Sequence, residues 1–260
     1  MPSLDKVPQT NASVKLILIG DSGTGKTGAL ASLVEADYRL RVWDYDNKLA
    51  GGILPIILKQ RCPGKLHNVE FESLRDSLKG SPIGPILDGA PQAYTRGLAL
   101  LDKWTDGTIP KTWNDGKTVV VVDSLTFLSD AAFNWARGMN PSAKDPRQWF
   151  YTAQSAVEDT LALLTASSFQ AHVIVISHVS WQDRPDGTMK GYPSSVGKAL
   201  GPTIPAYFEN MALCQTMAGK RTIQTVPTAL VDLKNPAAFK MAPTLPIETG
   251  LADFFKTIRS

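Results

Sequence analysis

The stretch KLILIGDSGTGKTGAL, residues 15–30, decides how the rest of this 260-residue chain is interpreted. The apolar run from Val14 to Ile19 predicts a buried strand, and Lys26 to Ala36 predicts the helix after it. Between them, Gly20 to Thr27 matches the pattern G-x-x-x-x-G-K-[ST] in full. Glycines let such a loop curl so that its backbone N–H groups point inward at phosphate oxygens, and the helix adds its positive N-terminal end. The sequence therefore predicts a phosphate-binding loop.

The residue types in this loop indicate how a nucleotide such as ATP would be held with Mg²⁺. The Lys26 ammonium is expected to reach the β and γ oxygens, and the Thr27 hydroxyl is expected to ligate the magnesium ion. Asp123 is expected to complete the magnesium shell, because it ends the apolar run Val119–Val122 and strand ends meet at the ligand-binding crevice. The residues predicted to bind the nucleotide are Gly20, Asp21, Ser22, Gly23, Thr24, Gly25, Lys26, Thr27 and Gly28.

The composition is that of a protein able to bury a large core, since 43% of its residues are apolar. A formal charge of +3 permits a nucleic-acid partner without requiring one. Cys62 and Cys214 are far apart in the sequence, which is typical of a reduced, intracellular protein. The first residues have no signal-peptide pattern, and no apolar run approaches the roughly 18 residues that span a bilayer. We therefore expect a soluble, cytoplasmic protein without a membrane partner.

Predicted strands and helices alternate along the chain, which favours an α/β fold with a mainly parallel sheet. We expect a flexible tail over residues 1–13 and a single domain over 14–260, with an irregular Pro/Gly-rich insertion at about 51–92 and a long loop over 180–205. Strands are predicted at Leu40–Trp43, Val69–Phe71, Val119–Val122, His172–Ser177, Met211–Met217, Thr222–Val226 and near Leu230. Helices are predicted at Lys26–Ala36, Ala93–Trp104, Leu125–Arg137, Pro146–Ala166 and from Gly250.

Two further motifs, VVVVDS at 119–124 and VWDYD at 42–46, resemble the RecA-type branch of the P-loop ATPases. The resemblance implies a RecA-like P-loop NTPase core whose parallel sheet is flanked by helices, with a C-terminal antiparallel hairpin around AGKR. In that branch an acid-x-acid pair follows the second strand, and its second acid polarises the attacking water. Asp44-Tyr45-Asp46 fits this pattern with aspartate where glutamate is usual, which implies Asp46 as the catalytic base, directly or through a second water. A turn-forming pair of aspartates is the alternative.

The strand VIVISH ends in Ser177-His178, where RecA-like proteins place a polar residue that senses the γ-phosphate. The resemblance therefore implies a catalytic group of Lys26, Asp46, Asp123 and His178. A histidine with a purely structural environment is the alternative for His178, and we expect that environment for His67 and His172.

The order of motifs after this strand, with GYPSS at 191–195 and LVDLKNP at 230–236, is similar to the phage RecA-like ATPases of the Sak type, which act in single-strand annealing or recombination. This similarity, over residues 14 to about 240, extends to the broader AAA-type phage ATPase family. It implies a homo-oligomer, a ring or a filament, with ATP at subunit boundaries and a basic residue supplied by the neighbour. The candidates for that residue are Lys220, Arg221 and Lys234, with ordinary solvated side chains as the alternative.

The segment from Ser180 to Gly201 lies where RecA-like proteins carry a DNA-contacting loop. Aromatic side chains can stack on bases while cations follow the phosphates, a combination suited to single-stranded DNA. The candidate DNA-binding residues are Trp181, Arg184, Lys190, Tyr192 and Lys198. A lid over the nucleotide is the competing interpretation.

The sequence thus favours a slow, DNA-stimulated ATPase that binds single-stranded DNA in phage recombination or annealing, in the host-cell cytoplasm if phage-encoded. A single-strand-binding protein is a further candidate partner. Three alternatives stay open: a replication motor or helicase loader, a small-molecule kinase, and an ATP-binding scaffold that hardly hydrolyses. The acid-x-acid pair argues against the kinase, because a kinase transfers the phosphoryl group to a substrate and does not need a base that polarises water.

Overall fold

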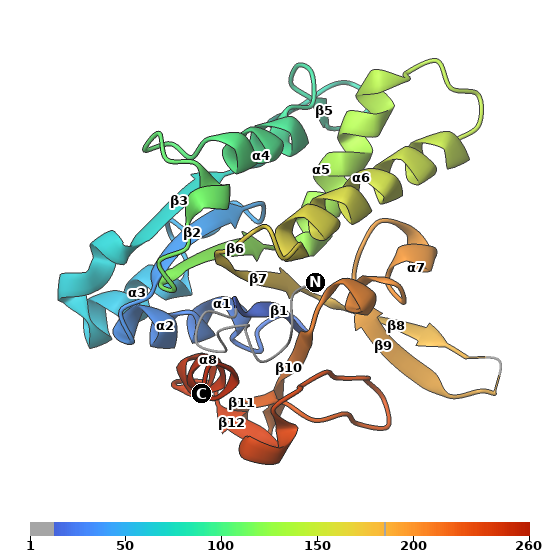
Figure 1. Ribbon diagram of the computed structural model, residues 1–260. Coiled ribbons are helices and arrows are strands. Elements are labelled where there is room, and N and C mark those ends of the chain that lie inside the picture. The colour runs from blue at the N-terminus through green and yellow to red at the C-terminus, as the bar shows by residue number, and fades with distance from the viewer. Residues whose placement is uncertain (1–12, 185) are drawn as a thin grey trace, which may run out of the picture.

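The computed structural model describes residues 13–184 and 186–260, so the predicted tail lies outside the described residues except for Ser13. An eight-stranded sheet forms the centre of the molecule in the order β12-β11-β10-β1-β7-β6-β2-β3 (Figure 1). The strands from β10 to β3 run parallel, whereas β11 and β12 are antiparallel to their neighbours. Their bounds are β1 Lys15–Gly20, β2 Arg39–Asp44, β3 Val69–Ser73, β6 Thr118–Asp123, β7 His172–Ser177, β10 Asn210–Met217, β11 Lys220–Gln224 and β12 Thr244–Pro246.

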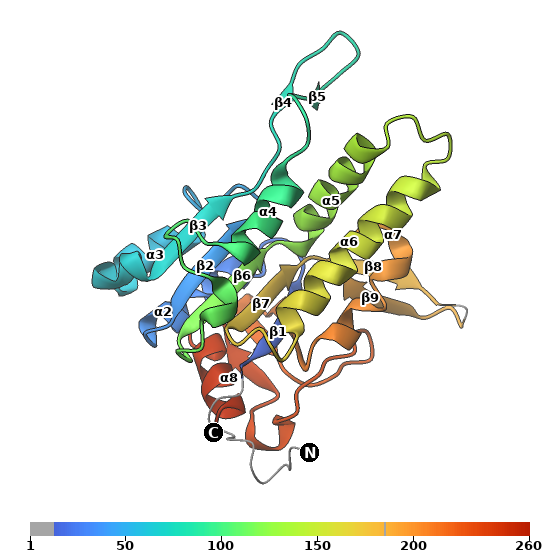
Figure 2. The ribbon, with the colours of Figure 1, turned by 45° about the horizontal axis from the view of Figure 1, so that its top comes forward.

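Helices cover both faces of this sheet (Figures 1 and 2). One face carries α4 Ala93–Asp102, α5 Leu125–Met139 and α6 Arg147–Thr165, and the other carries α1 Lys26–Ala29, α2 Ala31–Glu35 and α8 Gly250–Ile258. Alternate residues of β1 enter the two cores: Ile17 packs with the first set of helices and Leu18 with the second. Because both faces of the central strands are buried, these strands are continuous apolar runs in the sequence. The predicted α/β fold, with a mainly parallel sheet flanked by helices and a C-terminal antiparallel hairpin, is confirmed.

The apolar stripe of α6 lies against the sheet as its helical spacing predicts. Ala153, Val157, Leu161 and Leu164 are completely buried, while Phe150 stays 39% exposed and packs on Phe133 of α5. The predicted helix over Lys26–Ala36 is divided at Leu30 into α1 and α2.

The stretch 51–92 is more regular than its proline and glycine content predicts. It contains α3, Ile53–Arg61, then a 3₁₀ helix, Pro63–Asn68, and the edge strand β3. Pro55 is compatible with α3 because it lies in the first turn, where backbone N–H groups have no intrahelical partner. The short strands β4, Leu78–Lys79, and β5, Ile86–Leu87, form an arm that projects from the body (Figure 2).

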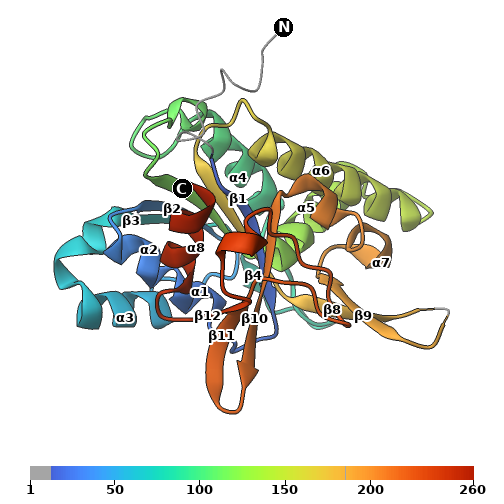
Figure 3. The same ribbon diagram turned by 60° about the horizontal axis from the view of Figure 1, so that its bottom comes forward.

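The prediction of a long loop over residues 180–205 is wrong for most of this range. Residues Val179–Asp183 (β8) and Met189–Pro193 (β9) form an antiparallel hairpin, followed by the short helix α7, Gly197–Leu200. The strand predicted near Leu230 is also wrong: residues 228–233 lie outside the named strands, and β12 forms the next sheet edge instead (Figure 3). Among the described helices, none is long and apolar enough to cross a membrane.

Candidate active site

The carboxyl ends of four neighbouring parallel strands bring the predicted site residues together. In the sheet register Ile19 of β1 lies opposite Ser177 of β7, and Asp123 of β6 lies opposite Asp44 of β2. The phosphate-binding loop therefore begins beside His178 and faces the two acidic strand ends, as expected for the crevice of a parallel sheet.

The loop adopts a conformation that its glycines make accessible. Gly23 and Gly25 have φ angles of +80° and +93°, in the left-handed region where glycine alone carries no Cβ penalty. The Lys26 side chain is buried along the loop, and its ammonium donates hydrogen bonds to the carbonyls of Gly20 (2.8 Å) and Asp21 (2.9 Å). Burial lowers the pKa of Lys26, which the nearby carboxylates partly oppose.

Thr27 and Asp123 are in direct contact at the start of α1. The Thr27 hydroxyl donates to Oδ2 of Asp123 at 2.7 Å, and the Asp123 carboxyl is only 5% exposed. Burial raises the pKa of Asp123 to about 7, reinforced by the charges of Asp46 and Asp44 and opposed by Thr27 and Lys26. A buried carboxylate surrounded by negative charge and paired with a hydroxyl is a fitting donor set for a hard divalent cation such as Mg²⁺.

The two acids of the DYD motif have different surroundings. Asp44 is buried and accepts hydrogen bonds from the backbone N–H groups of Lys48 (3.2 Å) and Leu49 (2.9 Å), so it fixes the turn after β2. Asp46 lines the cavity in front of the loop and accepts a hydrogen bond from the Ser124 hydroxyl at 2.6 Å. The turn-forming alternative thus describes Asp44, while Asp46 is the acid that faces the cavity.

His178 lines the same cavity as Lys26 and Asp46. Its Nδ1 lies 3.1 Å from the Thr126 hydroxyl, and its pKa is lowered by burial and then by the Lys26 charge. His172, in contrast, is buried away from the site, where Nδ1 accepts from the Val14 N–H, and His67 is exposed on the 3₁₀ helix after α3.

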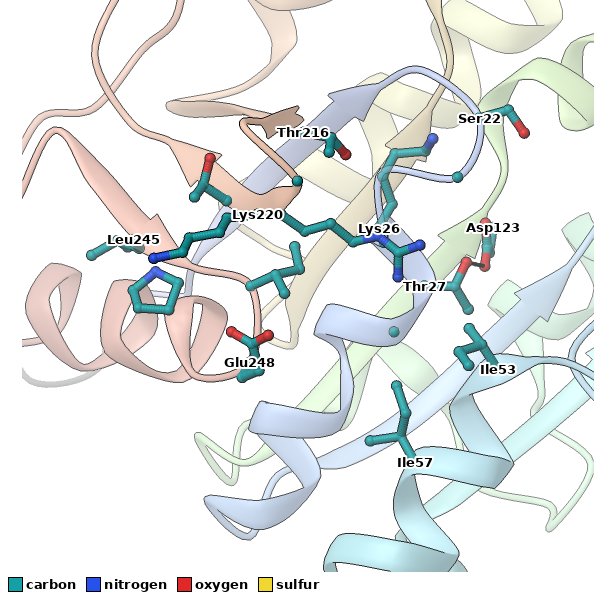
Figure 4. A pocket seen from close by; sticks show the side chains of 18 of the residues that line it. Ser22, Lys26, Thr27, Ile53, Ile57, Asp123, Thr216, Lys220, Leu245 and Glu248 are labelled. Carbon is teal, nitrogen blue, oxygen red and sulfur yellow. Dashed lines mark hydrogen bonds between the residues drawn. The ribbon is translucent and has the colours of Figure 1, made fainter.

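The cavity in front of the loop has a volume of about 1320 Å³ (Figure 4). Residues that the sequence did not indicate form two of its walls. Ile53 and Ile57 of α3 line one side, and Leu245, Pro246, Ile247 and Glu248 around β12 line the other. The apolar spacing of residues 53–58 could have indicated α3, whereas the three-residue strand β12 has no sequence pattern of its own.

The three candidates for a cation supplied by a neighbouring subunit lie in different places. Lys220 and Arg221 begin β11 and line the cavity of their own chain. Lys234 lies elsewhere, and its ammonium donates to the backbone carbonyls of Pro205 (2.8 Å) and Phe208 (2.9 Å). These bonds hold the Lys234 ammonium against residues of its own chain, and its role toward a neighbouring subunit stays a prediction.

The candidate DNA-binding residues are distributed over the β8–β9 hairpin and α7. Lys190 is only 7% exposed and forms an ion pair with Asp232, which corrects its prediction as a phosphate contact. Trp181 is 41% exposed, and Lys198 is exposed on α7. Tyr192 is half-buried and pairs with Ser180, so strand alternation directs it to the face opposite Trp181.

Arg184 is half-buried at the turn of this hairpin. The base of the hairpin is bonded to the end of β7. The Ser194 N–H donates to the carbonyl of His178 at 2.8 Å, and the Ser177 hydroxyl lies 3.2 Å from the carbonyl of Ser194. The hairpin and the nucleotide cavity therefore share one strand end.

Comparison with known proteins agrees with this geometry at the level of the family. Residues 12–237 match the family model described as an AAA domain. No curated protein gives a significant match. The crystal structure of the RadB recombinase is 16% identical, with a TM-score of 0.45 over 82% of this chain and 80% of that one. An ATPase from the type III secretion system of pathogenic bacteria is 12% identical, with a TM-score of 0.42, and the match covers 78% of this chain and 51% of that one. With a family model that spans most of its length, the chain belongs to the AAA domain family.

Proposed function

We propose that the protein hydrolyses Mg²⁺-bound ATP and uses the nucleotide to control binding of single-stranded DNA, in recombination or strand annealing. The observation that carries the first half is the convergence of Lys26, the Thr27–Asp123 pair and Asp46 on one cavity. These groups supply a counter-charge for phosphates, oxygen donors for a cation and a carboxylate for water, which are the parts that phosphoryl transfer to water requires.

Each side chain has a defined task in this proposal. Lys26 and the loop N–H groups bind the β- and γ-phosphates, and Thr27 and Asp123 hold the magnesium ion. The bound ion neutralises charge that develops on the phosphate oxygens. Asp46, oriented by the Ser124 hydroxyl, accepts a proton from the water that attacks the γ-phosphorus in line, and ADP leaves with the bridging oxygen. His178 donates toward the γ-phosphate oxygens from the strand end beside the loop.

The β8–β9 hairpin supports the second half of the proposal. It starts one residue after His178, exposes the Trp181 indole, and carries cationic side chains nearby at Arg184 and Lys198. An exposed aromatic ring with neighbouring cations suits single-stranded DNA, because bases stack on the ring without strict sequence readout. Assembly into an oligomer and a role in a phage follow from the sequence resemblance and are part of the same proposal.

The deciding experiment measures binding of a fluorescent single-stranded oligonucleotide over a range of salt concentrations, alongside ATP hydrolysis with and without that DNA. Trp181→Ala should weaken DNA binding by about 1–3 kcal/mol with little change in salt dependence. Lys198→Ala should reduce the slope of log affinity against log salt by about 0.7, the value of one phosphate contact on single strands.

Phe239→Ala is the matched control for Trp181, because Phe239 is an aromatic residue 82% exposed outside the hairpin, and it should leave DNA binding unchanged. A lid over the nucleotide would give the opposite pattern. In that case the Trp181 and Lys198 variants would change ATP affinity or turnover and leave DNA affinity as in the wild type, which would reject the DNA-binding half of the proposal.

A further inference from the structure

Arg221 lies over the phosphate-binding loop of its own chain. A Cβ atom added to Gly25 would be 3.2 Å from Cδ of Arg221 and 3.3 Å from Cγ1 of Ile247. The aliphatic part of the arginine thus passes across the loop at the residue before Lys26, and it can approach this closely because Gly25 has no side chain. Arg221 and Lys26 line the same cavity.

The sheet fixes this arrangement within one chain. β11 pairs with β10, and β10 pairs with β1 in a register that sets Cys214 opposite Gly20. The start of β11 is therefore held beside the loop by ladders of backbone hydrogen bonds, and the side chain of its second residue reaches the loop without a neighbouring subunit.

The charge of Arg221 has no acidic partner in the part of the chain that the structure describes. No ion pair within 4 Å involves its guanidinium, although Glu248 also lines the cavity. The residue is exposed to the cavity side, and Asp46 and Asp123 are already bonded to Ser124 and Thr27. A guanidinium offers a planar pair of donors that matches phosphate oxygens, so an unpaired arginine above a phosphate cradle is suited to bind the same anion.

We propose that Arg221 is a phosphate-binding residue of the nucleotide site and acts in cis, on the nucleotide bound to its own phosphate loop. This proposal rests on nucleotide binding as proposed above, and it replaces the expectation that Arg221 serves the site of a neighbour. Because Arg221 crosses the loop at Gly25, beside the loop N–H groups proposed to bind the β-phosphate, ADP and ATP should depend on it equally.

The first test measures ATP and ADP affinity on protein diluted until its measured mass is that of a monomer. Arg221→Ala should weaken both nucleotides by about 10- to 100-fold, the usual effect of losing a charge-assisted hydrogen bond. Arg221→Lys should recover part of the loss. Lys256→Ala, which removes an exposed cation on α8, should bind both nucleotides like the wild type. Unchanged ADP affinity in the Arg221→Ala monomer would overturn the proposal.

The second test mixes the variants Lys26→Ala and Arg221→Ala and measures ATP hydrolysis at an ATP concentration too low for either variant alone to hydrolyse it. If Arg221 acts in trans, a Lys26→Ala subunit can supply its arginine to the intact loop of an Arg221→Ala subunit, and activity returns. If Arg221 acts in cis, the mixture should hydrolyse ATP no faster than the sum of the rates of the two separate variants. A higher rate would refute the proposal. Failure of the wild-type protein to bind ATP at all would instead reject the proposed function, so the two failures are distinguishable.

Discussion

Asp44 and Asp46 stand two positions apart, yet their side chains have separate tasks. The Asp44 carboxylate is buried and receives two backbone N–H groups of the following turn, whereas the Asp46 carboxylate faces the cavity and is oriented by Ser124. The end of the strand explains the difference: two residues at positions i and i+2 of a strand share a face, but β2 ends at Asp44 and the chain turns before Asp46. The resemblance to an acid-x-acid pair thus combines one structural and one candidate catalytic residue.

Replacing Asp46 with asparagine should separate binding from hydrolysis. The variant keeps its shape and its acceptor for Ser124 but loses the basic carboxylate, so we expect ATP affinity to be retained and turnover to fall by about 10²-fold or more. Steady-state hydrolysis and equilibrium binding measure the two quantities. In the matched variant Asp44→Asn, the main effect should be a lower free energy of unfolding. Normal turnover in Asp46→Asn would assign the base to another residue.

Lys26→Ala should abolish tight ATP binding. The substitution removes the counter-charge for the β and γ oxygens, and a neutral methyl group cannot replace it. Isothermal titration with ATP in the presence of Mg²⁺ measures the loss. Lys59→Ala, a lysine exposed on α3, is a control of the same charge change and should bind ATP normally. Wild-type affinity in Lys26→Ala would contradict the interpretation of the loop.

At the scale of elements, the phosphate-binding loop begins in close contact with β10. A Cβ atom on Gly20 would lie 2.4 Å from the carbonyl oxygen of Cys214, a backbone atom held in the β1–β10 ladder. Gly20→Ala should therefore force the two strands apart and destabilise the protein by about 1–3 kcal/mol, the usual scale for an overpacked core. Urea unfolding gives the measurement. Gly51→Ala, where no atom lies within 4 Å, should be close to neutral, and equal stability of the two variants would contradict the steric argument.

The elements that could be predicted from the sequence are those with a local pattern. The run Val119–Val122 and the motif around Lys26 define β6 and the loop, and the rule for parallel strand ends then brings Asp123 to Thr27. Pairings over long sequence distances could not be predicted in this way. Lys190 has the appearance of a surface cation in the sequence, and only the fold brings Asp232, 42 residues away, into contact with it.

The two walls of the cavity, α3 and the residues around β12, are also hard to predict from the sequence. Three-residue β12 exists because β11 offers it a partner, so its formation depends on an edge built by residues before it. The helix α3 is hard to predict because it contains Pro55. Proline breaks a helix at an interior position but is tolerated in the first turn, where Pro55 lies.

At the scale of the whole molecule, His172 links three distant segments of the chain. Its Nδ1 accepts from the Val14 N–H at 2.9 Å, so Nε2 carries the proton and donates to the carbonyl of Gly116 at 3.2 Å. The ring is 2% exposed, and burial lowers the pKa of His172 to about 4. The folded protein therefore holds the imidazole neutral, whereas the unfolded chain binds a proton below about pH 6.5.

This difference predicts a loss of stability in acid. The contribution of His172 is fully present above about pH 6.5 and is lost as the pH falls toward 4, because the unfolded state gains protons that the folded state does not. Between pH 7 and pH 5, the free energy of unfolding should fall by about 2 kcal/mol more in the wild type than in His172→Gln. Urea unfolding at both pH values gives the comparison. His67→Gln, at an exposed position, should keep the wild-type dependence, and the same slope in His172→Gln would exclude His172 as its source.

The hydrogen bonds that join Ser194 to the end of β7 connect the β8–β9 hairpin directly to the strand end beside the proposed nucleotide cavity. When a ligand on β8–β9 displaces this junction, its binding carries a coupling free energy with the nucleotide, and that energy is the same whichever ligand arrives first. A nucleotide that tightens the hold on a strand of DNA tenfold is itself held ten times more tightly by the DNA-bound protein. Under the proposed function, the change from ATP to ADP would therefore alter the DNA affinity by the difference between their two coupling free energies, and the Ser194 hydrogen bonds are where that coupling would act.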